Sequence, residues 1–369
     1  MIKMGRHRIH LLYVYYLVVP LVSILAIIVS FFAVMPPREV VILAGPKEGY
    51  FATVATTISN ELASFGISAR IEHIEDTTHI IDRINGADMA GPHLGFVAQD
   101  LAAPPTDGVF SLGMISLEPL WLFSPANSDT RNIRDLKGKL VSIGPEGSGV
   151  RALSQRILSL YGIDETNTDF VDYGIMDSAS ALGEKRINAA FFLLPANTPV
   201  IEQLNSRADL QLIGIEEAEA LSHKISHLER VVIPKGTFNV RNLRPPQDVE
   251  TLALPVTVIS SKGSGDTLSA LVANILRENY AWETLFTKDY ELPSFVYYEL
   301  ETHPAAVDLY DSGLPYWTKI FGKKYGLIIS YAAHPIIFVF FTAVVMFGLV
   351  ITYAEFIPIL ISVRDLFRR

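Results

Sequence analysis

The residues best suited to ligand chemistry lie in the stretch GPEGSGVR, residues 144–151, which follows an apolar run typical of a strand. Its glycines, Gly144, Gly147 and Gly149, allow the backbone to turn tightly. The amphipathic residues after the turn predict a helix, and the first N–H groups of a helix have no partner within it. Because the helix dipole adds positive charge at this end, the turn predicts a binding site for a carboxylate or a phosphate.

Side-chain and backbone groups of this turn complete the predicted anion site. Ser148 adds a hydroxyl, and the backbone N–H groups up to Val150 point outward from the start of the helix. Arg151 lies in the first helical turn, where its guanidinium suits a paired contact with a carboxylate. The alternative is a turn that Ser148 caps without any ligand.

The spacing of the glycines excludes three enzyme motifs. A phosphate-binding P-loop needs a lysine after its last glycine, and Val150 stands there. A nucleophile elbow needs a glycine two residues before its serine, and that residue is Glu146. The dinucleotide fingerprint GxGxxG does not match Gly144, Gly147 and Gly149 either. We therefore expect no catalytic residue in this loop.

Two further strand ends carry polar or aromatic residues. Tyr50 and Phe51 follow the first predicted strand, and Gln99 and Asp100 follow a later one. In an open α/β sheet, ligands bind beyond the carboxyl ends of the strands. These four side chains therefore join the glycine turn in a predicted binding cleft, although an ordinary helix cap explains Gln99 and Asp100 equally well.

The residue types exclude several other kinds of chemistry. The chain of 369 residues has no cysteine, which excludes disulfides and thiolate metal sites. His223 and His227 share a predicted helix face but lack a carboxylate partner, so a solvated surface is the simpler interpretation. No catalytic acid–base pair stands in an apolar setting. We expect neither an enzyme nor a protein that carries a metal or a cofactor.

The charge and the order of apolar runs limit the partners and the fold class. The net charge is −9 and no long basic run occurs, which argues against nucleic acid as a partner. Short apolar runs alternate with helical patterns from residue 40 onward, which predicts an α/β fold with a mainly parallel sheet. In the last third, KGSGD is either a second anion loop or, as we favour, a turn before a helix that Asp266 caps.

Two apolar segments predict membrane spans. Residues 11–34 and 335–354 carry no charged side chain, and each is long enough to cross a hydrocarbon core of about 30 Å as a helix. A cleavable signal peptide is the alternative for the first segment. Basic residues before the first segment and after the second predict cytoplasmic termini and an extracytoplasmic middle. The expectation is a double-pass protein of the bacterial inner membrane.

Four stretches, in the right order, resemble the TAXI family of TRAP-transporter solute receptors. The family's binding loop, with its lead-in and its helix, matches DLKGKLVSIG and GPEGSGVRALSQRILSLYGID. A later strand and helix match INAAFFLLPANTPVIEQL, and the family's ending matches ETHPAAVDLYDSG. The sequence departs from the family at Val150, where a threonine is usual, and in SLEP, which lacks the family's tyrosine.

The resemblance implies an α/β fold, a clamshell of the type II periplasmic-binding-protein kind, and the two apolar segments add a predicted transmembrane helix at each end of it. Together with the apolar and basic segments, this predicts a basic cytoplasmic N-terminus, a transmembrane helix, an extracytoplasmic domain, a second transmembrane helix and a basic cytoplasmic tail: residues 1–10, 11–35, 38–325, 331–355 and 356–369. Within the domain, lobe 1 would comprise about residues 38–120 and 255–325, and lobe 2 about residues 121–254.

The function that the resemblance implies is reception of a small organic anion, an acidic amino acid or a dicarboxylate, for TRAP-type transport. Tyr50, Phe51 and Gln99 would close the cleft opposite the anion turn. The implied partners are TRAP-type permease subunits or another membrane protein, within the lipid bilayer. The alternative is a membrane-tethered ligand sensor or assembly protein that keeps the fold without transport.

Overall fold

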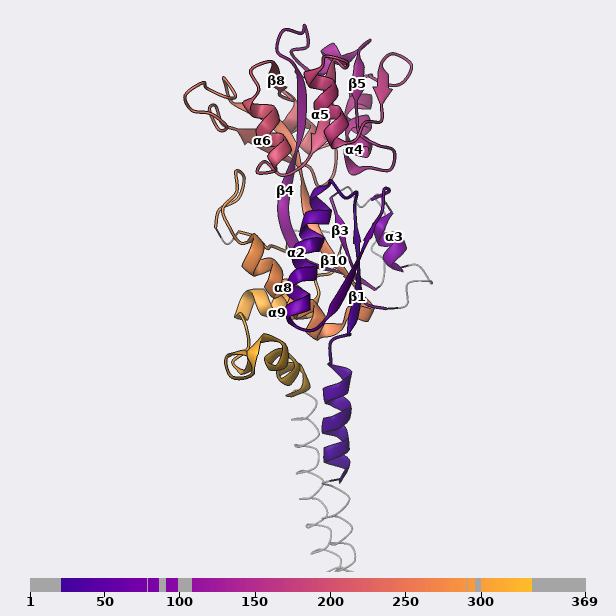
Figure 1. The fold of residues 1–369 in the computed structure, drawn as a ribbon, viewed down its shortest axis with the longest axis vertical. Coiled ribbons are helices and arrows are strands. Elements are labelled where there is room, and N and C mark those ends of the chain that lie inside the picture. Colours follow the sequence, from indigo (N-terminus) through magenta and orange to yellow (C-terminus); the bar gives the residue numbers. More distant parts are fainter. Residues whose placement is uncertain are drawn as a thin grey trace, which may run out of the picture. The chain divides into compact units, whose positions relative to one another are not determined.

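The computed structural model describes residues 21–77, 79–85, 91–98, 108–289, 291–295 and 300–333. The chain divides into two compact units. One unit is Pro37–Gly313, and the other combines Met1–Pro36 with Leu314–Arg369. The first unit contains the strands and helices labelled in Figure 1.

One mixed sheet forms the centre of the unit Pro37–Gly313. Among the described residues it has ten strands, with the order β2-β1-β3-β10-β4-β7-β5-β6, while β8 pairs with β4 and β9 with β10. The strands are β1 (Glu39–Ala44), β2 (Ser68–His73), β3 (His93–Val97), β4 (Val109–Pro125), β5 (Leu140–Ser142), β6 (Asp169–Val171), β7 (Ala189–Leu193), β8 (Leu210–Ile213), β9 (Glu229–Ile233) and β10 (Val249–Ser261). The helices are α2 (Tyr50–Ser64), α3 (Ile80–Asn85), η1 (Ile133–Leu136), α4 (Gly149–Leu160), α5 (Ile175–Gly183), α6 (Pro199–Ser206), α7 (Ala218–Ser222), η2 (Lys262–Ser264), α8 (Gly265–Tyr280) and α9 (Pro304–Ser312).

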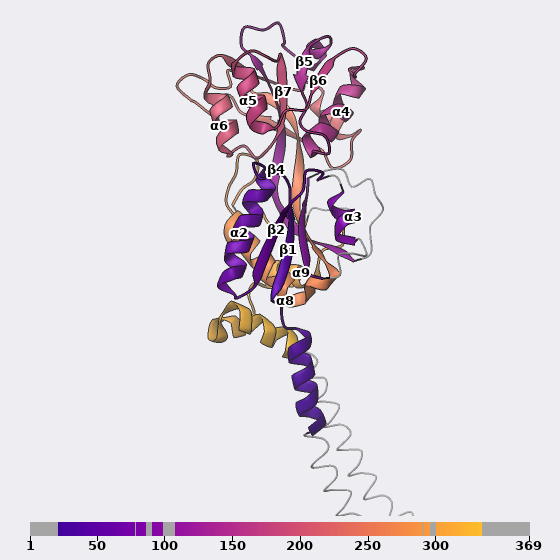
Figure 2. The same cartoon turned by 45° about the vertical axis from the view of Figure 1, so that its right-hand side comes forward.

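The long strands β4 and β10 connect two lobes of this unit (Figures 1 and 2). The first part of β4 pairs with β10, and beyond Pro119 it pairs with β7 and β8 instead. We name β1–β3 with α2, α3, α8 and α9 lobe A, and β5–β8 with α4–α7 lobe B. The strands β1, β2 and β3 are parallel to one another, as are β5, β6 and β7. The carboxyl ends of three parallel strands therefore gather at one edge of each lobe.

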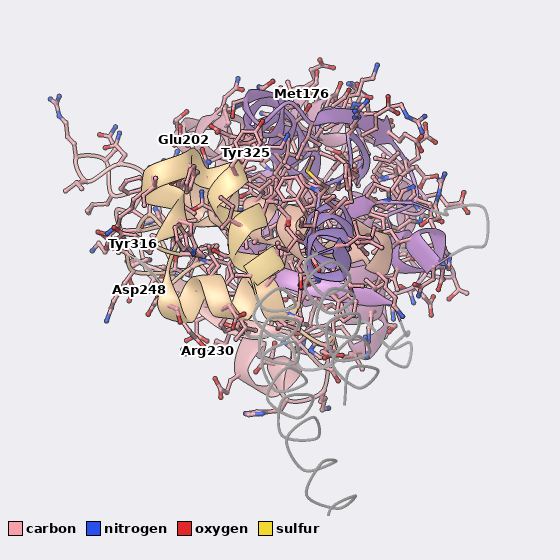
Figure 3. All side chains as sticks on the ribbon, turned by 90° about the horizontal axis from the view of Figure 1, so that it is seen from below. Met176, Glu202, Arg230, Asp248, Tyr316 and Tyr325 are labelled. Atoms are coloured by element: carbon pink, nitrogen blue, oxygen red, sulfur yellow. The ribbon has the colours of Figure 1, made fainter. Side chains whose placement is uncertain are left out.

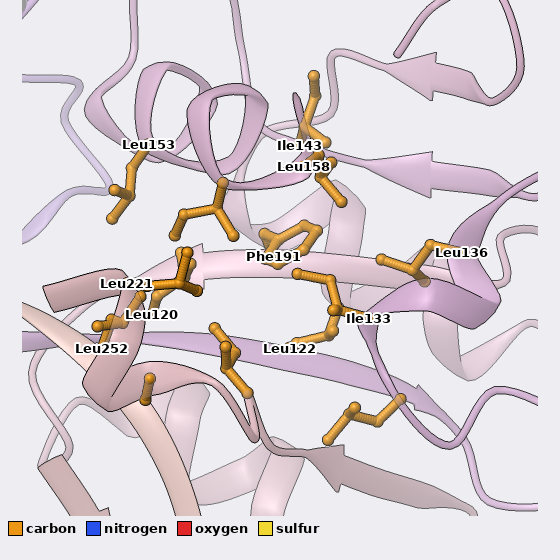
Figure 4. Close-up of a cluster of buried hydrophobic side chains, with 14 of the residues drawn as sticks. Leu120, Leu122, Ile133, Leu136, Ile143, Leu153, Leu158, Phe191, Leu221 and Leu252 are labelled. Carbon is orange, nitrogen blue, oxygen red and sulfur yellow. The ribbon is translucent and has the colours of Figure 1, made fainter. Parts of the chain in front are cut away.

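Each lobe has its own buried hydrophobic cluster. In lobe B, Leu120 and Leu122 of β4 and Phe191 of β7 pack with Leu153 and Leu158 of α4 (Figure 4). A second cluster in lobe A joins β1, β3, α3 and β10. Removing one large side chain from such a core costs about 2–5 kcal/mol. The core of each lobe therefore fixes the position of the edge at which the parallel strands of that lobe end.

The start of α8 differs from the sequence-based prediction. Asp266 is predicted to cap this helix, but Ser264 occupies the N-cap position and Asp266 lies in the first turn. The reason is that the 3₁₀ turn η2 runs directly into α8 and begins the helix earlier than the capping preference of Asp266 suggests. The carboxylate of Asp266 still favours the helix, because negative charge is stabilised near a helix N-terminus.

The predicted localisation is contradicted. Residues 21–33 are helical, while residues 1–20 and 334–369, which hold the rest of both predicted spans, lie outside the described residues. Within the part of the chain that the structure describes, no helix is long and apolar enough to cross a membrane. The prediction of a double-pass inner-membrane protein with cytoplasmic termini is therefore wrong.

The second helical stretch of the terminal unit also differs from a spanning segment. Residues 317–333 are helical and include Lys319, Lys323 and Lys324. Charged side chains at such density are costly inside a bilayer. The aromatic side chains of Tyr316, just before this stretch, and Tyr325, within it, are exposed (Figure 3).

Candidate ligand-binding site

A cavity of about 150 Å³ lies between the two lobes, and we name it the interlobe cavity. Lobe A lines it with residues from the loops after β1, β2 and β3, and lobe B with residues from the loops after β5, β6 and β7. The carboxyl ends of the parallel strands of both lobes therefore face the same space, which is where open α/β sheets bind ligands. The volume holds about ten water-sized spheres, enough for a small organic molecule.

Three helices begin at the interlobe cavity. The N-cap residues of α2, α4 and α5 are Gly49, Ser148 and Gly174, and all three line its wall. The first N–H groups of each helix have no partner inside the helix, and α2 and α5 have no side-chain cap. Since each helix N-terminus carries partial positive charge, three of them together favour a ligand group with acceptor oxygens.

The turn at residues 144–151 has the shape that its glycines predict. Gly144 has a φ of 90°, and a Cβ on it would lie 2.3 Å from the Val150 side chain. The Ser148 hydroxyl caps α4, since it accepts a hydrogen bond from the N–H three residues later at 3.3 Å and donates to the carbonyl three residues earlier at 2.6 Å. Ser148, Gly149 and Val150 line the interlobe cavity.

Gly147 has a different place from the one predicted. It does not line the cavity, and its carbonyl oxygen accepts a hydrogen bond from the N–H of Thr77, 3.1 Å away in lobe A. Its φ is 74°, and a Cβ on it would lie 2.9 Å from the Cβ and Cγ of Asp76. Gly147 therefore serves the close approach of the two lobes, and its role toward a ligand stays a prediction.

Arg151 also lies outside the cavity wall. Its guanidinium pairs with the carboxylate of Asp172, just after β6, and donates to the carbonyl oxygen of Gly144 at 3.3 Å. These contacts tie the loop after β5 to the loop after β6. The structure thus gives Arg151 a positioning contact, while its pairing with a ligand carboxylate stays a prediction.

Tyr50 and Phe51 begin α2 and line the cavity from lobe A. The ring of Phe51 stacks on Phe96, with 5.3 Å between the ring centroids. Burial, together with the nearby Tyr280 and Glu118, raises the pKa of the Tyr50 hydroxyl, so this group is neutral at physiological pH. These two side chains give the cavity an aromatic wall, while Gln99 and Asp100 lie outside the described residues.

Glu118 is the cavity residue that the sequence analysis missed. It lies on β4 opposite Leu254 of β10, close to the point where β4 passes from one lobe to the other. Its side chain lines the cavity and the residue is only 3 % exposed. Burial raises the pKa of its carboxyl well above the ordinary value. The sequence feature that could have identified Glu118 is a single acidic residue inside the apolar run SLEPLWLF, a pattern that predicts a buried strand.

Among the described residues that line the interlobe cavity, the charged side chains are acidic, and partial positive charge comes only from the backbone at the helix N-termini. Its ionisable acids are Glu48 and Glu118, and it includes no lysine, arginine or histidine. Among the described residues, no group of three or more histidine, aspartate or glutamate side chains is placed to hold a metal ion.

Two α/β lobes joined by crossing strands, with a cavity at the carboxyl ends of their parallel strands, define a periplasmic-binding-protein-like fold. This class agrees with the α/β clamshell predicted from the sequence, whereas its flanking transmembrane helices are not confirmed. The chain belongs to the NMT1-like family, whose model matches residues 98–285. This match does not show the TAXI group in particular.

Solved structures resemble the chain at low sequence identity. The periplasmic aliphatic sulphonate-binding protein SsuA from Escherichia coli is 11 % identical, with 81 % of this chain and 79 % of that chain covered and a TM-score of 0.39. A putative periplasmic sulfonate-binding protein from Methylobacillus flagellatus KT is 14 % identical, with 82 % and 88 % covered and a TM-score of 0.41. The effector-binding domain of a BenM variant is 10 % identical, with 68 % and 98 % covered and a TM-score of 0.44. All three TM-scores lie below 0.5, so the family assignment rests on the sequence match alone.

Proposed function

We propose that this protein is the solute-binding component of a transport system and holds a small carboxylate-bearing solute in the interlobe cavity. The observation that carries the proposal is the meeting of three helix N-termini, those of α2, α4 and α5, at one small cavity. A carboxylate there accepts hydrogen bonds from N–H groups that have no partner within their helices. The sequence motifs support a TRAP-type system, with an acidic amino acid or a dicarboxylate as the solute.

The binding step uses both lobes. The ligand carboxylate lies at the start of α4, where Gly149 and Val150 line the cavity, and Tyr50 and Phe51 cover it from lobe A. Because the ligand contacts both lobes, it favours the arrangement in which they are close together. The membrane subunits of the transporter then recognise that arrangement and receive the solute.

Titration of the purified full chain with carboxylates of increasing length, by isothermal calorimetry and thermal shift, tests the binding step. We expect at least one carboxylate to bind with a dissociation constant of about 1 μM, equivalent to about 8 kcal/mol. If no carboxylate binds at millimolar concentration, the proposal is wrong. Uptake of the bound solute by cells that express the chain with TRAP-type membrane subunits tests the transport step, and unchanged uptake would contradict it.

A further inference from the structure

The interlobe cavity offers a second kind of group besides the helix N-termini. Glu118 is nine-tenths buried or more and lines the cavity, and its carboxyl group forms no hydrogen bond or ion pair with the other residues that the structure describes. A buried carboxyl without a partner is costly, whether it is ionised or neutral. In a binding site, the ligand itself is the partner that removes this cost.

The charges around Glu118 decide which ligand group fits. The ionisable groups near it are Tyr50 of α2, which interacts with both Glu118 and Tyr280, and Glu48 and Tyr173 on the cavity wall. None of them is a cation. A dicarboxylate would place a second negative charge in a cavity whose described side chains supply no positive charge. An ammonium group instead finds a carboxylate partner at Glu118 and the faces of aromatic rings.

Resting on the proposed function, we infer that Glu118 selects for a solute that carries an amino group as well as a carboxylate. The carboxylate of this amino acid lies at the helix N-termini, and its ammonium group donates to the carboxylate of Glu118. Such a zwitterion has no net charge and satisfies both kinds of cavity group. The inference narrows the solute class from organic anions in general to amino acids.

Proton release gives this pairing a direct signature. Burial favours the protonated form of the Glu118 carboxyl in the empty cavity, because it raises the pKa of this group well above the ordinary value. An ammonium group beside it favours the ionised form, so binding of an amino acid releases protons, with one proton per bound ligand as the upper limit. Calorimetry of the full chain in buffers with different ionisation enthalpies measures this number.

Matched pairs of probes test the selectivity, each pair being an amino acid and the same acid without its amino group. Alanine with propionate and glutamate with glutarate are two such pairs. We expect the amino acid of the preferred pair to bind at least about tenfold more tightly, and Glu118→Gln to weaken it by about 10- to 100-fold while it leaves the plain acid unchanged. Glu118→Gln also abolishes proton release.

The matched control is Glu229→Gln, the same substitution at a carboxyl whose pKa is also raised by burial but which lies outside the cavity lining. It leaves affinity and proton release as in the wild-type protein. If plain acids bind as tightly as their amino partners, or if Glu118→Gln weakens both alike, the inference is wrong and the proposed function stands. If no member of any pair binds, the proposed function itself fails. Amino-acid binding without proton release also overturns the inference.

Discussion

The backbone N–H of Thr77 in lobe A donates a hydrogen bond to the carbonyl oxygen of Gly147 in lobe B, across 3.1 Å. Thr77 lines the interlobe cavity, and Gly147 belongs to the turn that leads into α4. The bond therefore joins the lobes beside the cavity, away from the strands β4 and β10 that connect them through the sheet. The bond joins two backbone groups, so it depends on the backbone conformation around Thr77 and Gly147 rather than on a particular side chain.

Gly147→Ala is expected to disturb this contact and to weaken ligand binding although Gly147 lies outside the cavity wall. The new Cβ would lie 2.9 Å from the Cβ of Asp76, and the φ of 74° disfavours any side chain. The backbone strain costs about 1–2 kcal/mol. Urea unfolding measures the stability loss, and calorimetric titration measures the loss of affinity.

Gly138→Ala is the control for this change. Gly138 has a φ of 75°, but a Cβ on it meets nothing within 4 Å, and the residue is not part of the cavity wall. We expect a similar stability loss with unchanged affinity. Equal affinities for both variants would show that the contact between Thr77 and Gly147 does not support binding.

Ser148→Ala is expected to destabilise the protein by about 1 kcal/mol, because Ser148 is the N-cap of α4 and accepts the N–H of Arg151. Thr198 provides the comparison, since its hydroxyl also donates to the carbonyl three residues earlier but caps no helical N–H. Thr198→Ala should therefore cost less in a urea unfolding experiment. A loss as large as that of Ser148→Ala would contradict the capping role.

Glu118→Gln is expected to raise the free energy of unfolding at neutral pH. Burial raises the pKa of Glu118 in the folded protein, so this carboxyl stabilises the fold below its ordinary pKa and loses that contribution as the pH rises. Glutamine is neutral at every pH, so the variant does not lose this contribution to stability as the pH rises. Unfolding curves between pH 4 and pH 8 measure the difference, which should grow with pH, and a constant difference would contradict the buried carboxyl.

His303 is expected to make the protein less stable in acid. Burial lowers the pKa of His303 below its ordinary value of 6.5, although Asp266 and Glu301 oppose this shift. The unfolded chain then takes up the proton first, so stability is complete above about pH 6.5 and falls as the pH drops below it. The ring also caps α9, since its Nδ1 accepts the N–H of Ala305 at 3.2 Å.

His303→Asn separates these two properties of His303. Asparagine keeps a capping acceptor but does not titrate in this range, so the variant should lose less stability between pH 7 and pH 5. His223→Asn is the control, because the side chain of His223 is 76 % exposed. Identical pH profiles for the wild-type protein and His303→Asn would show that the ring of His303 is not the acid-sensitive group.

Local sequence determined the elements of this fold and the shape of the turn before α4. Apolar runs, glycines and helical periodicity are patterns among neighbouring residues, so the sequence alone can show them. The structure has the expected strand at Leu140–Ser142, followed by the turn and by the helix Gly149–Leu160, which Ser148 caps. Motif order along the chain likewise pointed to the α/β clamshell.

Only the tertiary structure decided which groups meet in the cavity. Glu118 reads as one residue of an apolar strand, and its position beside Tyr50 depends on how β4 crosses between the lobes. Arg151 was predicted for a ligand, yet folding brings Asp172 to it from another strand end. The physical reason is that burial and charge pairing depend on contacts between residues far apart in the chain, which no local pattern records.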